Sequence, residues 1–180
     1  AAVERNLSVL TPMSRQAFLL VAMELFTIDD AAVVLEITPE EVSSLLREAG
    51  EDISAQMSTN VLIIEDEPLI AMDLELIMQN LGHRVDRVVR TERQALDAVG
   101  QRAPGLILAD IQLADGSSGL DAVNEILNEV TVPVIFITAF PERLLTGTKP
   151  EPTFLIRKPY HHEAVRAVVS QALFFGVVPD

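Results

Sequence analysis

The apolar residues in the first part of the chain follow helical spacing. Residues 12–26 are apolar almost all round, which predicts a largely buried helix. A second, short helix is predicted over 29–36. A third begins after the cap residue Thr38, with Glu41 three positions further on, as in a capping box. Apolar side chains then recur at i, i+3, i+4 and i+7, as Val42, Leu45, Leu46 and Ala49.

From residue 60 onward, short apolar runs alternate with helical patterns. Strands are predicted over 61–64, 83–89, 105–109, 132–137 and 153–157. Helices are predicted over 68–81, 92–102, 119–129 and 162–174, with only about one helical turn at 141–145 before a segment that contains prolines. This alternation predicts an α/β fold, a doubly wound (βα)5 domain with a parallel sheet in the order 2-1-3-4-5.

Length and composition agree with two unequal domains, which we place at 1–57 and 58–180. The stretch 50–59 between them is as compatible with a short helix as with a flexible linker. Of the 180 residues, 49% are hydrophobic and 22% charged, and no apolar run approaches the roughly 20 residues that span a bilayer. The chain contains no cysteine, which suits a cytoplasmic protein and excludes thiolate metal sites. Its net charge of −14 argues against binding to a nucleic acid backbone.

Polar residues follow four of the predicted strands, at the point where each strand ends. The carboxyl ends of parallel strands meet at one edge of a sheet, where ligands of such folds bind. We therefore expect these side chains to form one site: Glu65 and Asp66 after the first strand, Asp110 after the third, Thr138 after the fourth and Lys158 after the fifth.

The residue types at this edge are those needed to transfer a phosphoryl group to a carboxylate. Asp110 supplies the nucleophile, Thr138 a hydroxyl donor and Lys158 a cation for the developing charge. A hard cation such as Mg²⁺ prefers oxygen ligands. The expected metal ligands are Glu65, Asp66, Asp110 and the backbone carbonyl of Gln112.

Residues 60–175 resemble the receiver domain of two-component response regulators. The resemblance implies that Glu65 and Asp66 form the metal-binding acid pair, that Asp110 is the phosphoacceptor and that Thr138 senses the phosphate. It also implies a histidine kinase or phosphotransferase as the phosphoryl donor, and a protein that is not a turnover enzyme. Lys158 corresponds to the lysine of the Lys-Pro pair, and we expect the bond between Lys158 and Pro159 to be cis.

Two positions depart from the receiver pattern. The loop 112–119 lacks the usual proline, and Leu155 stands where many receivers carry an aromatic switch residue. Tyr160, just after the Lys-Pro pair, is the candidate switch residue that takes this role. The alternative for Tyr160 is an aromatic side chain that simply packs on the sheet edge.

Leu10, Pro12, Phe18, Leu25 and the stretch 27–35 resemble the fourth region of extracytoplasmic-function sigma factors, whose last helix reads promoter DNA. The resemblance covers residues 8–50. Residues 1–57, however, carry ten acidic residues against three arginines, a net charge of −7. The helix that corresponds to the DNA-reading helix contains Arg47 as its only basic residue. The pattern indicates a sigma mimic with no direct DNA binding. Its candidate partner-binding residues are Glu40, Glu41, Leu45 and Glu48.

A sigma-like unit ahead of a receiver resembles the PhyR family of general stress response regulators. In that family the phosphorylated protein binds a NepR-type anti-sigma factor and so frees the sigma factor. The resemblance therefore implies an anti-anti-sigma factor controlled by phosphorylation of Asp110. Members also carry a further sigma-like segment upstream, so we expect this chain to be a fragment.

Two other functions remain open at this point. A DNA-binding response regulator needs a basic recognition helix, whereas residues 38–50 are acidic. A phosphatase with an Asp nucleophile usually has a second Asp two residues later, where this chain has Gln112. For the switch itself, we expect the sigma-like helices to pack on the receiver surface at 140–157 until phosphorylation loosens that contact.

Overall fold

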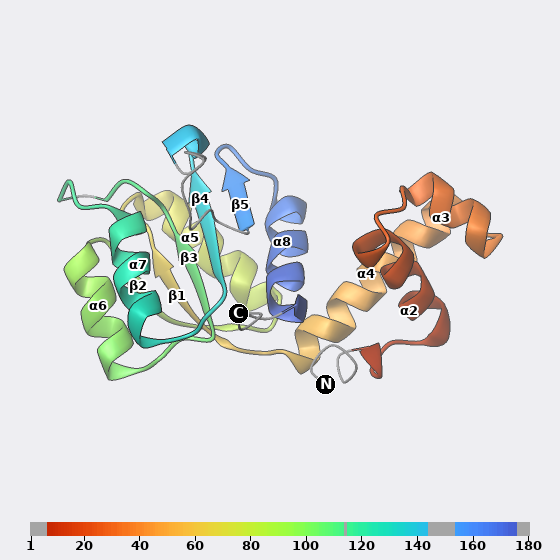
Figure 1. Cartoon of the computed structure of the whole chain (residues 1–180), viewed down its shortest axis with the longest axis horizontal. Coiled ribbons are helices and arrows are strands. Elements are labelled where there is room, and N and C mark those ends of the chain that lie inside the picture. Colours follow the sequence, from red (N-terminus) through yellow and green to blue (C-terminus); the bar gives the residue numbers. More distant parts are fainter. Residues whose placement is uncertain (1–6, 114, 144–153, 176–180) are drawn as a thin grey trace. The chain divides into compact units, whose positions relative to one another are not determined.

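The computed structural model describes residues 7–113, 115–143 and 154–175. The chain divides into two compact units, Ala1–Met57 and Ser58–Asp180, each of which is described by itself below. Figure 1 shows the helical first unit in red to orange, and the α/β second unit from yellow to blue. Within the described part of the chain, every helix is too short or too polar to span a bilayer.

The first unit, hereafter the sigma-like unit, has four helical segments within residues 12–56. They are α2 (Pro12–Phe18), the π-helix η1 (Leu19–Met23), α3 (Ile28–Leu35) and α4 (Pro39–Gln56). Ala31, Ala32 and Val42 form the centre of its small core, and half-buried apolar side chains of η1 and α4 pack around them. The three predicted helices are therefore all present.

The first helix is shorter and less buried than its apolar sequence predicts. Regular α-helix ends at Phe18, the π-helix ends at Met23, and Leu25 is 84% exposed. Leu25 has a positive φ of 59°, and Thr27 is extended because it caps α3 through its side chain. Leu25 and Phe26 therefore lie outside the helix although they are apolar.

Helix α4 begins with the expected capping box. The Thr38 hydroxyl accepts a hydrogen bond from the Glu41 backbone N–H, and the Glu41 carboxylate accepts one from the Thr38 N–H. The helix then runs without interruption to Gln56. Ala49 and Ile53 continue the buried side that begins at Val42, so an apolar stripe supports the helix beyond Gly50. Of the two alternatives for the stretch 50–59, the helix is therefore correct up to Gln56, and residues 57–59 connect it to β1 (Asn60–Ile64).

The second unit, hereafter the receiver unit, is the predicted α/β fold. Its parallel strands lie in the order β2-β1-β3-β4-β5. They are β1 (Asn60–Ile64), β2 (Arg84–Val89), β3 (Leu106–Ala109), β4 (Val134–Thr138) and β5 (Phe154–Arg157). The helices are α5 (Pro68–Asn80), α6 (Glu92–Gln101), α7 (Gly119–Glu129), the short 3₁₀ helix η2 (Pro141–Arg143) and α8 (His162–Phe175). Residues 144–145 of the predicted short helix lie outside the described residues.

Helices cover both faces of this sheet (Figure 1). Leu62 and Ile64 belong to a core cluster that also contains residues of α6 and α7. Because side chains alternate along a strand, Val61 and Ile63 face the opposite side, and they are also fully buried. This double burial explains why the strand sequence is apolar throughout.

His83, between α5 and β2, is a buried titratable side chain of the receiver unit. It is 4% exposed, its Nδ1 accepts a hydrogen bond from the Thr59 N–H (3.4 Å), and its Nε2 has no partner among the described residues. Burial lowers the pKa of His83 below its ordinary value of 6.5. The unfolded chain therefore takes up the proton first, and stability present above about pH 6.5 is lost as the pH falls toward the folded pKa.

We expect His83→Gln to flatten this dependence. The wild-type protein should lose stability between pH 7.5 and 5.5 more steeply than the variant, by at most about 1.4 kcal/mol per pH unit. Urea unfolding followed by circular dichroism at both pH values measures the difference. His161→Gln, at an exposed position, is the matched control. Equal slopes for the wild type and His83→Gln would contradict the prediction.

Candidate functional site

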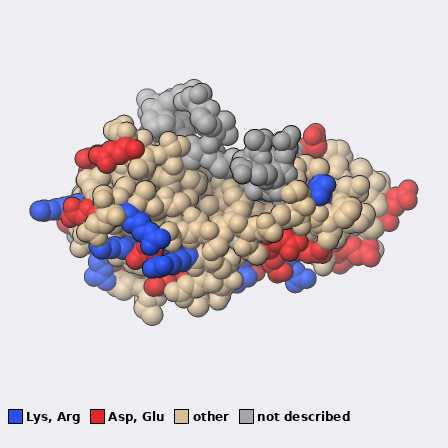
Figure 2. All heavy atoms as spheres, turned by 90° about the horizontal axis from the view of Figure 1, so that it is seen from below, with Lys and Arg blue, Asp and Glu red and all other residues tan. Residues whose placement is uncertain are grey.

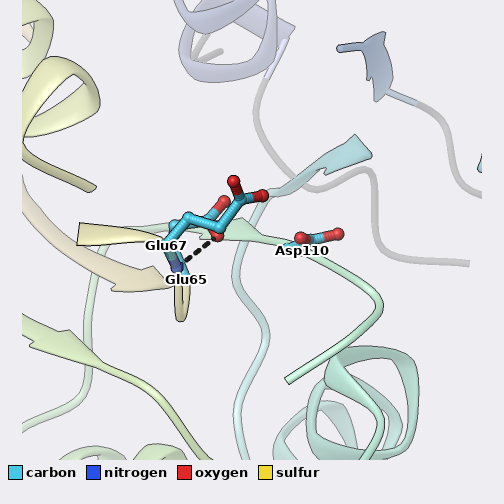
Figure 3. A group of neighbouring side chains, drawn as sticks. All are labelled: Glu65, Glu67 and Asp110. Carbon is cyan, nitrogen blue, oxygen red and sulfur yellow. Dashed lines mark hydrogen bonds between the residues drawn. The ribbon is translucent and has the colours of Figure 1, made fainter. Parts of the chain in front are cut away.

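The acidic site forms where two neighbouring strands end. β1 and β3 pair with Ile64 opposite Ala109, so Glu65 and Asp110 leave the sheet side by side. The Asp110 N–H donates to the Ile64 carbonyl at 2.9 Å, which extends the strand pairing into the site. Glu65 is 1% exposed and Asp110 is 8% exposed. Figure 3 shows Glu65 and Glu67 at the end of β1 and Asp110 at the end of β3.

Lys158 joins these acids from the end of β5. Its Nζ lies 2.8 Å from Glu65 Oε2, 2.9 Å from Asp110 Oδ2 and 3.2 Å from Glu67 Oε1. The Lys158 backbone N–H donates to the Thr138 carbonyl at 2.8 Å, so β4 holds the lysine in place. The bond between Lys158 and Pro159 is cis, as expected from the sequence. The side chains that the sequence assigned to three strand ends therefore meet at one ammonium group.

Three carboxylates are close enough to bind one metal ion. Ligand oxygens of Glu65, Glu67 and Asp110 all lie within 4.8 Å of one another. Asp66 is half-buried and is not a member of this group. The chain bends at Asp66, and the Glu67 N–H donates to Glu65 Oε1 at 3.0 Å (Figure 3). Glu67 is thus a site residue that the sequence analysis did not select, although it belongs to the same acidic run.

Burial and ion pairing act in opposite directions on this cluster. Burial raises the pKa of the Glu65 carboxyl, and the hydrogen bonds from Lys158 and the Glu67 N–H offset this only in part. Burial alone would lower the pKa of Lys158, but its hydrogen bonds and attraction to Glu65 and Asp110 outweigh burial and raise it. Lys158 therefore stays charged at neutral pH and neutralises part of the acidic cluster.

The loop after β3 needs a glycine beside Asp110. The Gly119 N–H donates to the Ile111 carbonyl at 2.7 Å, and a Cβ at position 119 would lie 1.7 Å from the Asp110 carbonyl oxygen. The Ile111 N–H in turn donates to Asp110 Oδ1 at 2.6 Å. Close approach of the Gly119 backbone therefore helps to place the Asp110 carboxylate. The sequence signal was a glycine directly after the helix cap Ser118.

Thr138 is the last residue of β4, and Gln112 lies two residues after Asp110 in the loop that follows β3. Thr138 is fully buried, and its Oγ1 accepts a hydrogen bond from the Phe140 N–H at 3.1 Å. Gln112 is exposed and forms an isolated antiparallel bridge with Ser118. The predicted role of the Gln112 carbonyl as a metal ligand stays a prediction.

Tyr160 is tied to helix α5. Its hydroxyl donates to Asp73 Oδ2 at 3.0 Å, and His162 Nε2 lies 2.8 Å from Asp73 Oδ1. Asp73 therefore connects the segment after Lys158 to α5, a contact that neither sequence interpretation of Tyr160 included. Burial, and then the hydrogen bond to Asp73, raise the pKa of the Tyr160 phenol.

Removal of the Asp73 carboxylate should be visible in the titration of Tyr160. We expect Asp73→Ala to move the midpoint to lower pH, because the phenol loses an acceptor that favours its protonated form. The chain has one tyrosine and no tryptophan, so absorbance near 295 nm reports Tyr160 alone. Asp97→Ala, at an exposed position on α6, should leave the midpoint unchanged. An unchanged midpoint in Asp73→Ala would show that this contact is not maintained in solution.

The candidate partner-binding residues lie on α4. Glu40 and Glu48 are exposed and Leu45 is half-buried, whereas the carboxylate of Glu41, also exposed, is engaged in the capping box. The surface proposed for the switch contact, 140–157, includes residues 144–153, which lie outside the described residues.

Comparisons with known proteins identify both units. Residues 7–56 match the sigma-like domain of the response regulator PhyR, and residues 61–170 match the response regulator receiver domain. The chain is 57% identical over 173 residues to the phyllosphere-induced regulator PhyR of Methylorubrum extorquens, which covers 96% of this chain and 65% of that relative. The chain thus spans just under two thirds of the length of this curated relative.

Solved structures give the same assignment. The crystal structure of the response regulator PhyR from Brucella abortus is 57% identical, with a TM-score of 0.72 over 94% of this chain and 70% of that one. The anti-anti-sigma factor PhyR from Bartonella quintana, crystallised with the anti-sigma factor NepR, is 55% identical, with a TM-score of 0.57 over 96% of this chain and 71% of that one. The chain belongs to the PhyR family of response regulators, with a sigma-like domain followed by a receiver domain.

Proposed function

We propose that this chain is a protein-binding switch controlled by phosphorylation. Phosphorylation of Asp110 allows the sigma-like unit to bind an anti-sigma factor of the NepR type, which then releases its sigma factor. The observation that carries the proposal is the meeting of Lys158, Glu65 and Asp110 in a receiver that is joined to a sigma-like unit. Similarity to the Bartonella quintana PhyR crystallised with NepR supports the choice of partner.

Asp110 is the proposed phosphoacceptor. A carboxylate oxygen of Asp110 forms a bond to phosphorus, and the bond from phosphorus to the imidazole nitrogen of a donor phosphohistidine breaks. The electron pair of that bond stays on the imidazole, which then takes up a proton. The ammonium of Lys158, 2.9 Å from Asp110 Oδ2, lies where it can balance the charge of the incoming group. The donor is a histidine kinase or phosphotransferase, and the receiver does not turn over a substrate.

The carboxylates fit a divalent cation, for which we propose Mg²⁺. Glu65, Glu67 and Asp110 carry three negative charges against the one positive charge of Lys158, so the cluster retains a charge of −2. A hard cation there would neutralise the phosphoryl oxygens. Asp66 and the Gln112 carbonyl are the remaining ligands proposed from the sequence.

Thr138 is the proposed sensor of the phosphoryl group. Its hydroxyl oxygen now accepts from the Phe140 N–H. A hydroxyl that turned toward a phosphoryl group on Asp110 would give up this bond to the Phe140 N–H. The change would thus begin directly before η2, in the part of the receiver unit proposed to contact the sigma-like helices. Tyr160 is the second proposed switch residue, and its bond to Asp73 would have to open for it to move.

The sigma-like unit is proposed to bind protein and not DNA. Helix α4 exposes Glu40 and Glu48 beside Arg47, and residues 1–57 carry a net charge of −7. Such a surface repels phosphates and suits a partner with basic residues. A DNA-binding response regulator is therefore the weaker alternative.

The cytoplasmic location expected from the sequence stays a prediction.

One binding experiment tests the proposal. A NepR-type anti-sigma factor is titrated into the full chain by calorimetry, with Mg²⁺ alone and with Mg²⁺ plus beryllofluoride as a phosphoryl mimic. We expect the mimic to increase the affinity by about tenfold or more, a typical coupling energy between two sites. Asp110→Asn should show no such increase. Equal affinity with and without the mimic, or specific retardation of promoter DNA at physiological salt, would refute the proposal.

A further inference from the structure

A second charged site lies on the receiver unit, between β2 and α6. It is a pocket of about 230 Å³ whose charged lining residues, hereafter the rim, are Arg84, Asp86, Arg87 and Arg102. Arg84 begins β2 and Arg102 follows α6, so the pocket extends toward the amino ends of the strands, whereas Asp110 lies beyond their carboxyl ends. Figure 2 shows basic side chains gathered on the receiver unit, at the left of that view.

The rim keeps an excess of positive charge after its internal contacts are counted. Asp86 Oδ1 lies 3.2 Å from Arg84 Nε, and Asp86 Oδ2 lies 3.4 Å from Arg102 Nε. Arg87 donates from Nη2 to the Gln101 side-chain oxygen, a neutral partner. Three guanidinium groups and one carboxylate give a formal charge of +2, in a chain whose net charge is −14.

The internal contacts also place these groups for binding. The Asp86 carboxylate forms ion pairs at the Nε atoms of two arginines, so the terminal nitrogens of Arg84 and one terminal nitrogen of Arg102, Nη1, are not used by the contacts described here. Arg102 donates from Nη2 to the Asn60 amide oxygen at 2.8 Å when that amide is oriented to accept. A simple exposed ion pair would neutralise one arginine with one acid. Here two arginines share one carboxylate at the edge of a cavity.

The pocket lining also contains apolar residues. Leu62 and Ala98 are two of them, and both side chains belong to the buried core between the sheet and α6. The volume of the pocket is below the roughly 300 Å³ at which pockets for drug-sized ligands begin, so the ligand must be small. A ligand that fits both kinds of lining residue has an anionic group for the arginines and a short apolar part for Leu62 and Ala98.

We propose that this pocket binds a small phosphomonoester in its dianionic form. The charge of such a group matches the +2 of the rim, and guanidinium forks recognise phosphate oxygens in pairs. Such binding goes beyond the proposed switch, since it uses none of the side chains of the acidic site. It would give the receiver unit a second input, sensitive to a phosphorylated small molecule.

The full chain, labelled with ¹⁵N and free of Mg²⁺, tests this at pH 7.5 with three probes. Phenyl phosphate carries both the dianion and the apolar group, inorganic phosphate carries only the anion, and benzyl alcohol carries only the apolar part. We expect phenyl phosphate to bind at least about fivefold more tightly than either of the others. The backbone amide signals of the protein that shift when phenyl phosphate binds should belong to residues 84–87 and 98–104. Shifts confined to residues 65, 110, 138 and 158 would place the anion in the acidic site and overturn the proposal.

Substitutions at the rim supply the second criterion. Arg87→Gln and Arg84→Gln should each weaken binding of phenyl phosphate about tenfold, the effect of losing one charge-assisted hydrogen bond. Arg93→Gln, at an exposed position of α6 outside the pocket lining, removes the same charge and should have little effect. An equal loss in Arg93→Gln would indicate unspecific attraction, and no loss in Arg87→Gln and Arg84→Gln would exclude the rim. Either result overturns the proposal, while failure of the anti-sigma experiment does not affect it.

Discussion

Asp110→Asn is expected to accept no detectable phosphoryl group from a histidine kinase or phosphotransferase. The carboxamide lacks the negative charge of the nucleophile, and removal of a nucleophile typically lowers a rate by at least about 10³-fold. The substitution is nearly isosteric, and the Asn oxygen can still accept the hydrogen bond from the Ile111 N–H. The loss should therefore reflect chemistry and not unfolding.

The labelled site can be identified directly by mass spectrometry of the wild-type protein and the variant. Asp115→Asn, at an exposed position of the loop that follows Asp110, is the matched control and should be labelled normally. Lys158 and a backbone N–H engage both oxygens of Glu65, as they do those of Asp110, so the labelled peptide has to distinguish these two acids. Normal labelling of Asp110→Asn, or label on another acid in the wild type, would refute the assignment.

The main elements of the receiver unit follow from sequence because one rule covers all of them. Apolar strands that end in polar residues place those residues at one sheet edge, and Glu65, Asp110 and Lys158 indeed meet there. Backbone topology alone brings them together, although Lys158 is 93 residues from Glu65 and 48 residues from Asp110. No estimate of side-chain reach is needed for this prediction.

The details that the sequence did not predict depend on side-chain direction. Whether Asp66 or Glu67 turns toward Asp110 depends on the local path of the chain after β1, which apolar periodicity does not describe. The contact of Asp73 with Tyr160 joins residues 87 positions apart, and Asp73 looks like any half-exposed acid on a helix. Leu25 was expected to be buried because it is apolar, but its positive φ belongs to the turn before α3.

Lys158 is central to the site because it is the cation that three carboxylates share. With Lys158→Met, the buried Glu65 and Asp110 would remain beside Glu67 without a neutralising charge. Breaking a buried pair by removing one partner typically costs about 3 to 5 kcal/mol. Glu67 is largely exposed and water screens part of the charge, so we expect a loss of roughly 2 to 4 kcal/mol in the free energy of unfolding at neutral pH.

A lower pH should reduce the loss of stability in Lys158→Met. Without Lys158, the hydrogen bond and attraction that lower the pKa of Glu65 disappear, and burial raises that pKa further than in the wild type. The carboxyl is then protonated in the folded variant at a pH where it is still charged in the unfolded chain. The stability deficit is therefore present above the folded pKa and shrinks as the pH falls below it.

A divalent cation should also reduce the loss, which separates an electrostatic effect from a packing effect. The cluster carries −3 in Lys158→Met and −2 in the wild type, so Mg²⁺ should bind the variant more tightly and stabilise it more than it stabilises the wild type. At a Mg²⁺ concentration of 100 times the Kd of the variant, the variant should gain about 2.7 kcal/mol in total. Urea unfolding with and without Mg²⁺ measures both effects, and Arg157→Met, at the exposed neighbouring position, is the control. If Lys158→Met is as stable as the wild type without Mg²⁺, or gains less from Mg²⁺ than the wild type does, the ammonium does not neutralise the acidic site.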